Sequence, residues 1–170
     1  MSVSPVATNP SAKQDRFQRQ FFVDTRIDPA VGAPELYLIG EDNDDLSRDI
    51  SWNNETTRNV LGRRVSSSTR SDEGVSTDPF YARQDDPLGL LLQHLDETKA
   101  ELDAIKRDFY EAKVDNDGVT IYAFKQIADL MVQSAGGAAA DADNIPFDIA
   151  LSGARVEQDF DFATQTFSDV

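Results

Sequence analysis

The chain has 170 residues, with 31 acidic and 16 basic side chains that give a formal net charge of −15. The absence of cysteine excludes a disulfide framework, cysteine-based zinc sites and thiol nucleophiles. This length suits a single domain with a substantial core, and no apolar run approaches the ~18 residues of a membrane span. We therefore expect no membrane insertion, and a surface that repels DNA and other polyanions.

Aspartate dominates the acidic residues, with 23 Asp against 8 Glu, and arginine dominates the basic residues, with 11 Arg against 5 Lys. Two explanations of this bias stay open. One is solubility alone, and the other is adaptation to concentrated salt in a halophilic host. At ~1 M salt the Debye length falls to ~3 Å. Long-range repulsion of DNA would then largely vanish, and the carboxylates would act through hydration.

The first part of the chain alternates polar segments with short β-prone runs. Residues 1–16 are polar and contain two prolines, which predicts a mobile N-terminal arm ahead of one domain over residues 17–170. Residues 69–77 are rich in turn formers, so we expect an exposed loop there. The predicted strands or extended segments before this loop are 35–40, 48–54 and 56–68.

One long segment is strongly periodic, with apolar side chains at three- and four-residue steps. This spacing predicts an amphipathic α-helix over about residues 86–109. Asp85 or Asp86 can cap its start, and Pro87 suits its first turn. A helix with one apolar stripe must pack on another surface. The predicted core residues of this stripe are Leu88, Leu92, Leu95, Leu102 and Ile105.

The segments after the helix favour β structure. Two β-prone runs flank the turn sequence DNDG at residues 115–118, which predicts a hairpin over residues 109–124. Residues 125–133 fit either a helix or a strand, and residues 134–144 are expected to form a flexible loop. Farther on, apolar and acidic residues alternate on both sides of an expected turn at Ser152–Gly153, which predicts a second hairpin. Its predicted core residues are Phe147, Ile149, Leu151, Phe160 and Phe162.

These elements together predict a mainly β fold with one α-helix. We expect an antiparallel β-sandwich or partial barrel, in which the apolar face of the C-terminal hairpin seats the helix. The acidic face of the same hairpin then points away from this core. Its acids are Asp148, Glu157, Asp159 and Asp161.

The sequence offers little material for catalysis. His94 is the only histidine, so the chain has no HExxH motif, and it has no P-loop and no dinucleotide-binding motif. We expect no enzyme, no cofactor and no metal site. The DNDG run resembles part of a calcium loop, but Lys113 and Phe124 would then occupy positions where an EF-hand needs carboxylates. A hairpin turn is the favoured interpretation.

Several motifs in a fixed order carry a resemblance to a known family. The run NVLG at residues 59–62 is followed by DPFYAR at 78–83 and by DPL at 86–88, and residues 145–167 are similar to the family's C-terminal hairpin. Over residues 52–167 the chain therefore resembles the major tail tube proteins of long-tailed, siphovirus-like bacteriophages and of archaeal tailed viruses. The resemblance implies the phage tail-tube type of β fold, and it favours a strand after the first hairpin.

The resemblance also implies a function. A tail tube subunit forms hexameric rings that stack into a tube around a tape-measure protein, and genomic DNA later passes through the lumen without specific binding. The implied partners are ring neighbours, stacked rings, the tape-measure protein, and tail-terminator and baseplate proteins. The implied location is the virion tail, after synthesis in the host cytoplasm. Acids on the lumen wall would give DNA no points of attachment, and the candidates are Asp148, Glu157, Asp159 and Asp161.

Other functions stay open at this stage. A neck or tail-terminator subunit would form one ring and would not polymerise. An acidic DNA mimic and a calcium-dependent binding module belong to different classes, and a mimic would cluster its acids on one helix-spaced face. Within the tail tube interpretation, the N-terminal arm and the expected loops at 69–77 and 134–144 are candidate contacts between rings.

Overall fold

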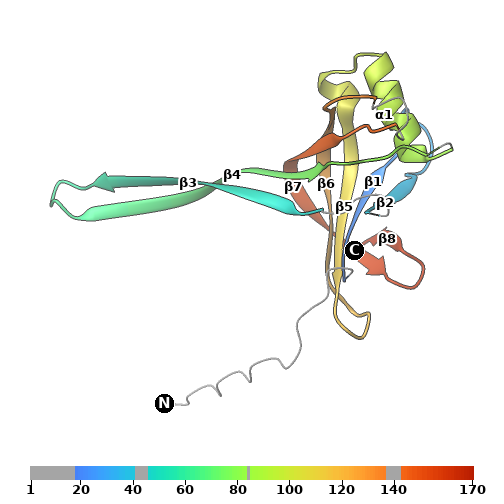
Figure 1. Ribbon diagram of the computed structural model, residues 1–170. Coiled ribbons are helices and arrows are strands. Elements are labelled where there is room, and N and C mark those ends of the chain that lie inside the picture. The colour runs from blue at the N-terminus through green and yellow to red at the C-terminus, as the bar shows by residue number, and fades with distance from the viewer. Residues whose placement is uncertain (1–17, 41–45, 84, 137–142) are drawn as a thin grey trace.

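The computed structural model describes residues 18–40, 46–83, 85–136 and 143–170, and Figure 1 shows their arrangement. The predicted N-terminal arm and most of the expected loop at 134–144 lie outside the described residues. The described part contains eight strands, one α-helix and a short 3₁₀ helix. The strands are β1 (Arg19–Asp24), β2 (Leu36–Ile39), β3 (Arg48–Arg58), β4 (Arg64–Thr77), β5 (Lys106–Val114), β6 (Thr120–Val132), β7 (Phe147–Asp161) and β8 (Thr166–Asp169). The α-helix is α1 (Pro87–Glu97), and the 3₁₀ helix is Leu102–Ile105.

The strands form one antiparallel sheet with two free edges. Their order is β2-β1-β5-β6-β7-β4-β3, and β8 pairs with the end of β7. The sheet does not close into a barrel. The predicted mainly β fold with a single helix is confirmed. The expected strands at 35–40 and 48–54 correspond to β2 and to the first half of β3.

The helix α1 covers one face of the sheet, as Figure 1 shows. It begins where the sequence predicts, because the Asp86 side chain accepts the N–H of Leu88 at 3.2 Å and Pro87 occupies the first turn. Its apolar stripe packs against aromatic and aliphatic side chains from both halves of the sheet. The buried members on the helix are Leu88, Leu91, Leu92 and Leu95, and those on the strands include Phe21, Phe109, Leu130, Phe147 and Ile149.

The predicted end of the helix is wrong. The N–H of Ala100 donates to the carbonyl of Leu95 at 2.9 Å, and the N–H of Lys99 donates to Asp96 at 3.1 Å. These two bonds form a Schellman motif, with Lys99 in the left-handed conformation at φ 49°. The chain therefore leaves the helix before Leu102, which is 80% exposed and does not belong to the core. Ile105 is half-buried in the 3₁₀ helix, and β5 follows at once.

A second core lies on the opposite face of the sheet, where the β7–β8 hairpin folds over it. Aromatic rings dominate this core: the centroids of Phe160 and Phe167 are 4.6 Å apart, and those of Tyr110 and Phe167 are 4.8 Å apart. The sheet is thus covered on both faces: α1 packs on one face, and the β7–β8 hairpin packs on the other. The buried members of the second core are Phe22, Tyr110, Ala112, Val114, Ala123 and Phe160.

The predicted C-terminal hairpin at Ser152–Gly153 is instead one continuous strand, β7. The pairing with β6 shifts between Lys125/Val156 and Ile127/Ser152, so β7 carries a bulge here, with Gly153 at φ 75°. The bulge adds two residues to β7 and so keeps the alternation of side chains in phase: odd-numbered residues of β7 lie on the α1 face and even-numbered residues lie on the other face. Phe147 and Ile149 are buried under α1 and Phe160 in the second core, while Leu151 and Phe162 are partly buried.

The predicted hairpin around residues 115–118 is confirmed as β5–β6. Asp115 closes its turn, since its carboxylate accepts the N–H groups of Asp117 at 2.9 Å and Val119 at 2.8 Å. Gly118 supplies the positive φ, 81°, that the turn requires. The strand interpretation of residues 125–133 is also correct, because β6 continues to Val132.

The strands β3 and β4 form a long two-stranded arm that projects away from the rest of the molecule (Figure 1). The predicted loop at 69–77 is therefore wrong, since these residues belong to β4. Only the end of β4, Glu73–Thr77, pairs with β7. Every residue from 51 to 72 is exposed. A ribbon with solvent on both faces needs no alternating apolar pattern, and this explains why residues 69–72 carry no strand signal.

Candidate assembly surfaces

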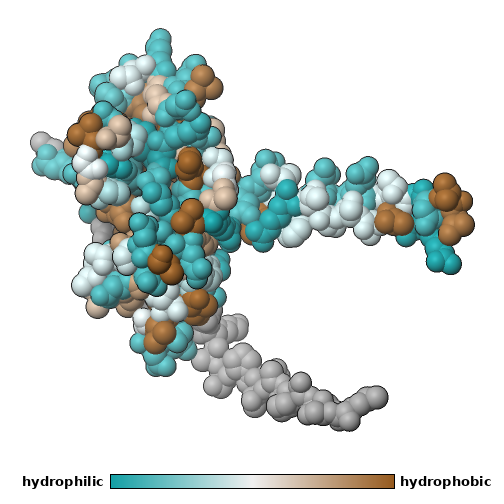
Figure 2. All heavy atoms as spheres, turned by 180° about the vertical axis from the view of Figure 1, so that it is seen from behind, coloured by the Kyte–Doolittle hydropathy of each residue, from teal (hydrophilic) through white to brown (hydrophobic). Residues whose placement is uncertain are grey.

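The tip of the arm is a tight turn with an apolar end. The Asn59 side chain accepts the N–H groups of Leu61 and Arg63, each at 3.0 Å, and Gly62 takes a φ of 73°. The NVLG run therefore builds this turn. Val60 and Leu61 are 103% and 74% exposed. Figure 2 shows them as an apolar patch at the end of an otherwise polar arm.

The tip is also basic. Arg58 and Arg64 are register partners across the arm, and Arg63 is next to them. Like charges directly opposite each other destabilise a strand pair. Within the part of the chain that the structure describes, these three side chains form no ion pair and no hydrogen bond. Residues 51–72 contain four arginines and two acids, Glu55 and Asp72. This segment therefore has a charge of +2, although the whole chain carries −15.

A buried carboxylate contacts the root of the arm, where β3 and β4 join the rest of the sheet. Glu111 in β5 is 0% exposed and accepts hydrogen bonds from Arg48 Nη1 and Tyr122 Oη, both at 2.6 Å. Arg19 Nε lies 3.6 Å from the same carboxylate. Burial raises the pKa of Tyr122, and the hydrogen bond to Glu111 raises it further. Because Arg48 is the first residue of β3, this contact connects the arm to the centre of the sheet.

A second carboxylate joins the arm to β7. Glu73 binds Arg70 at 2.6 Å on the arm side and Arg155 at 2.7 Å on the side of β7. The Arg155 guanidinium lies 4.2 Å from the centroid of Phe124, and that of Arg70 lies 5.4 Å from Trp52. Such cation–π contacts add to the ionic attraction. Together with the Glu111 contacts, they form a chain of interactions from β5 and β6 to the free part of the arm.

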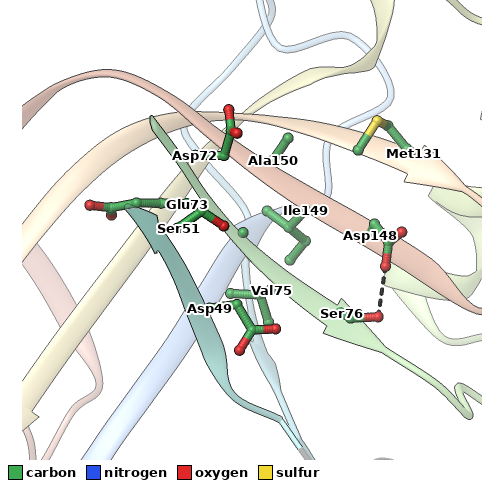
Figure 3. A pocket seen from close by; sticks show the side chains of 11 residues that line it. Asp49, Ser51, Asp72, Glu73, Val75, Ser76, Met131, Asp148, Ile149 and Ala150 are labelled. Carbon is green, nitrogen blue, oxygen red and sulfur yellow. Dashed lines mark hydrogen bonds between the residues drawn. The ribbon is translucent and has the colours of Figure 1, made fainter. Parts of the chain in front are cut away.

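A β-bulge lies just beyond Glu73, where the free part of the arm begins. The register of β3 and β4 slips between Ile50 and Trp52, so β4 has an extra residue there, and such bulges bend and twist a ribbon. Figure 3 shows the hollow beside this bend, of about 350 Å³, which lies on the face opposite α1. Asp49, Asp72 and Asp148 border it, and Asp148 accepts a hydrogen bond from Ser76 Oγ at 2.7 Å.

A larger groove lies at the other edge of the sheet, between the β1–β2 connection and the start of α1. Its volume is about 500 Å³. The side chains of Ile27, Val31 and Leu90 line it and are 57%, 67% and 52% exposed. Asp28 and Glu35 add two carboxylates that form no salt bridge within the described residues.

The four acids predicted for a lumen wall do not share one face. Asp148 lies on the face opposite α1, because its neighbours Phe147 and Ile149 are buried under the helix. Glu157 lies an odd number of residues farther along the same strand, so it lies on the other face, where it pairs with Phe124 on the α1 side of the sheet. Asp159 and Asp161 alternate in phase with Glu157. Asp161 also accepts the N–H of Ala163 at 2.9 Å, and this bond lowers the pKa of its carboxyl.

The remaining chemical features are sparse. Within the described residues, no group of three or more histidine, aspartate or glutamate side chains is arranged to hold a metal ion. No helix in this part of the chain is long and apolar enough to cross a membrane. Comparison with models of known protein families and with curated proteins finds no match for this chain. The arm, its root and the edge groove are therefore the features from which we infer function.

Proposed function

We propose that the protein is a structural subunit of a viral tail tube, which assembles into hexameric rings that stack around a lumen for genomic DNA. The observation that carries this proposal is the arm, a ribbon of β3 and β4 that has no partner among the described residues of its own subunit over residues 51–72. An isolated two-stranded ribbon is marginally stable in water. A neighbouring copy that packs against the arm would stabilise it.

The free edges of the sheet support the same proposal. Among the strands that the structure describes, β2 and β3 each have one side without a strand partner. Unpaired edges are aggregation sites unless another chain or element covers them. Contact between different edges of neighbouring copies is heterologous, and such contacts close into rings or continue as helical tubes. An open sheet with an arm is thus suited to assembly with copies of itself and with tail-terminator and baseplate proteins.

The proposed lumen wall is the sheet face opposite α1, in the part that β8 does not cover. Asp108 and Asp129 lie on this face together with Asp148, because they alternate with residues that are buried under the helix. Lys125 pairs with Asp108 at 2.8 Å and neutralises part of this charge. A wall of this kind suits DNA that passes without binding. Under this assignment Asp148 lines the lumen, and Glu157, Asp159 and Asp161 lie on the other face.

Electron microscopy of the purified protein over a range of protein and salt concentrations tests the proposal. We expect hollow tubes or six-fold rings. A matched variant replaces residues 55–67 by Asn-Gly, so that Asn54 and Ser68 remain paired below a short turn. We expect this variant to keep the thermal unfolding transition of the body and to form no tubes, because it lacks the arm.

Three outcomes of this experiment distinguish the candidate functions. Tubes formed by the wild type but not by the shortened variant would support the proposal. Single rings that never stack would favour a neck or tail-terminator subunit. Wild-type monomers under all conditions would contradict a ring-forming function, and the acidic DNA mimic and the calcium-dependent module would then be the classes to test.

A further inference from the structure

The tip of the arm has the properties of a ligand for an acidic, apolar surface. Val60 and Leu61 expose almost their whole side chains, and Arg58, Arg63 and Arg64 surround them without partners in the described part of the chain. A single subunit gains nothing from this arrangement, because the arginines repel one another and the apolar side chains face water. The arrangement becomes favourable when the tip is bound.

We propose that the arm tip of one copy docks in the groove between the β1–β2 connection and α1 of a second copy. This groove offers Ile27, Val31 and Leu90 to the apolar part of the tip. Its exposed carboxylates, Asp28 and Glu35, suit the arginines. The two surfaces thus match in both apolar character and charge.

The one basic side chain that lines the groove does not oppose this docking. The Arg26 guanidinium donates to Asp24 Oδ2 from Nε at 2.8 Å and from Nη2 at 2.6 Å, and also to the carbonyl of Gly32 at 2.6 Å. Its charge is therefore compensated within the subunit. The groove is also held in shape, because Arg107 donates to the carbonyls of Arg26 and Ile27, each at 3.1 Å. A preformed groove reduces the entropy lost on binding.

The positions of the two surfaces make the contact directional. The groove adjoins β1, near one edge of the sheet, and the arm is formed by β3 and β4 at the other edge. In Figure 1 the arm points away from α1, so the tip does not reach the groove of its own subunit. A contact between two different surfaces leaves a free tip and a free groove on every pair of copies, and it therefore continues from copy to copy. This inference rests on the proposed function and names the surface that receives the arm.

The absence of cysteine in the chain allows a direct test by crosslinking. One preparation carries Leu61→Cys in the tip and the other carries Val31→Cys in the groove. The two are mixed under assembly conditions and oxidised with diamide. We expect a disulfide-linked dimer at least about tenfold more abundant than in a control mixture of Leu61→Cys with Ile121→Cys, a position on β6 that is 50% exposed. Equal yields in the two mixtures would overturn the proposal.

Charge reversal gives a second, independent measurement. Arg63→Glu with Arg64→Glu reverses the tip, and Asp28→Arg with Glu35→Arg reverses the groove. We expect each double variant alone to lose tubes, because its tip and its groove then carry charge of the same sign. A mixture of the two variants should form tubes again, because each tip can meet a groove of opposite charge on a copy of the other variant. Combining all four substitutions in one chain should restore tubes, since every tip then meets a groove of opposite charge. Failure of this restoration, with the variant folded, would overturn the proposal.

The outcomes also separate this inference from the proposed function. Wild-type tubes without the tip-to-groove crosslink would retain the tail tube function and overturn the docking site. Wild-type monomers without any crosslink would overturn both. Binding of wild-type protein to phosphatidylserine vesicles, lost on reversal of the tip and accompanied by no crosslink, would assign the tip to an anionic membrane surface and would likewise overturn the proposal.

Discussion

At the scale of single residues, Glu111 is the most buried charge at the root of the arm. Its carboxylate compensates Arg48 and accepts the hydroxyl of Tyr122. Replacing Glu111 by Gln keeps the size of the side chain but leaves Arg48 without its counter-charge. Breaking a buried pair in this way costs about 3 kcal/mol or more. We expect urea denaturation to show a loss of this size in the free energy of unfolding.

Two measurements accompany the Glu111→Gln variant. The control is Glu97→Gln at the exposed end of α1, which should change the free energy of unfolding by less than about 0.5 kcal/mol. The pKa of Tyr122 should move toward its ordinary value in Glu111→Gln, since the hydrogen bond to the carboxylate is lost. If the two variants unfold at the same urea concentration, Glu111 does not hold the arm root.

Glu73 should make the arm root sensitive to acid. Burial alone would raise the pKa of Glu73, but Arg155, Arg48 and Arg70 together hold it below its usual range. A carboxyl with a depressed pKa stabilises the folded state above its ordinary pKa, near 4.3, and this contribution is lost as the pH falls through the folded-state value. We expect Glu73→Gln to be less stable than the wild type near neutral pH, and the difference to vanish in strong acid. A difference that does not change with pH would exclude this role.

At the scale of elements, the sequence could predict where α1 begins but not where it ends. Asp86 and Pro87 are recognisable start signals, whereas the stop depends on Lys99 in the left-handed conformation, where glycine is usual. The apolar spacing also continued through Leu102 and Ile105, which gave no reason to end the helix. A periodic pattern identifies an element, but backbone hydrogen bonds decide its boundary.

The two neighbouring leucines Leu90 and Leu92 test the helix face. Leu92, on the buried face of α1, is 0% exposed, and Leu90 is 52% exposed. We expect Leu92→Ala to cost about 3 kcal/mol, because it removes buried surface and leaves a cavity. Leu90→Ala should cost less than about 0.5 kcal/mol. Thermal or urea unfolding of the two variants measures both values, and equal losses would show that α1 is rotated from the described orientation.

The other elements show which sequence signals are ambiguous. The pair Ser152–Gly153 predicts a turn, but a glycine with positive φ also occurs in a bulge within a strand, as Gly153 does in β7. The arm could be predicted only in part, because the sequence indicated a strand at 48–54 and an extended segment at 56–68 but not the turn at 59–63 that pairs them. Its strands are long and polar, and nothing in the alternation of residues 51–72 marks a buried face. Of the proposed docking site, the sequence marks only the NVLG run, because the groove combines residues from the β1–β2 connection and from α1, which lie far apart in the chain.

At the scale of the whole molecule, charge should control assembly through two opposing effects. Each copy carries −15, so copies repel one another, whereas the tip contributes only three arginines to the contact between them. Both effects weaken as salt shortens the Debye length from ~10 Å at 0.1 M to ~3 Å at 1 M. The apolar part of the contact does not depend on this screening.

The net charge of the whole subunit is larger than the charge of the tip, and it therefore decides whether salt promotes or weakens assembly. Repulsion acts between whole acidic subunits through many pairs of exposed charges, so salt weakens it strongly. The attraction between tip and groove acts at one site that excludes part of the solvent, so salt weakens it less. We therefore expect light scattering to show more assembly at ~1 M than at ~0.1 M sodium chloride. The variant with Arg63→Gln and Arg64→Gln should need more protein to assemble at either salt concentration, but should respond to salt in the same direction. Assembly by the wild type that weakens steadily with salt would mean that ion pairs, rather than apolar contact and shape, hold the copies together.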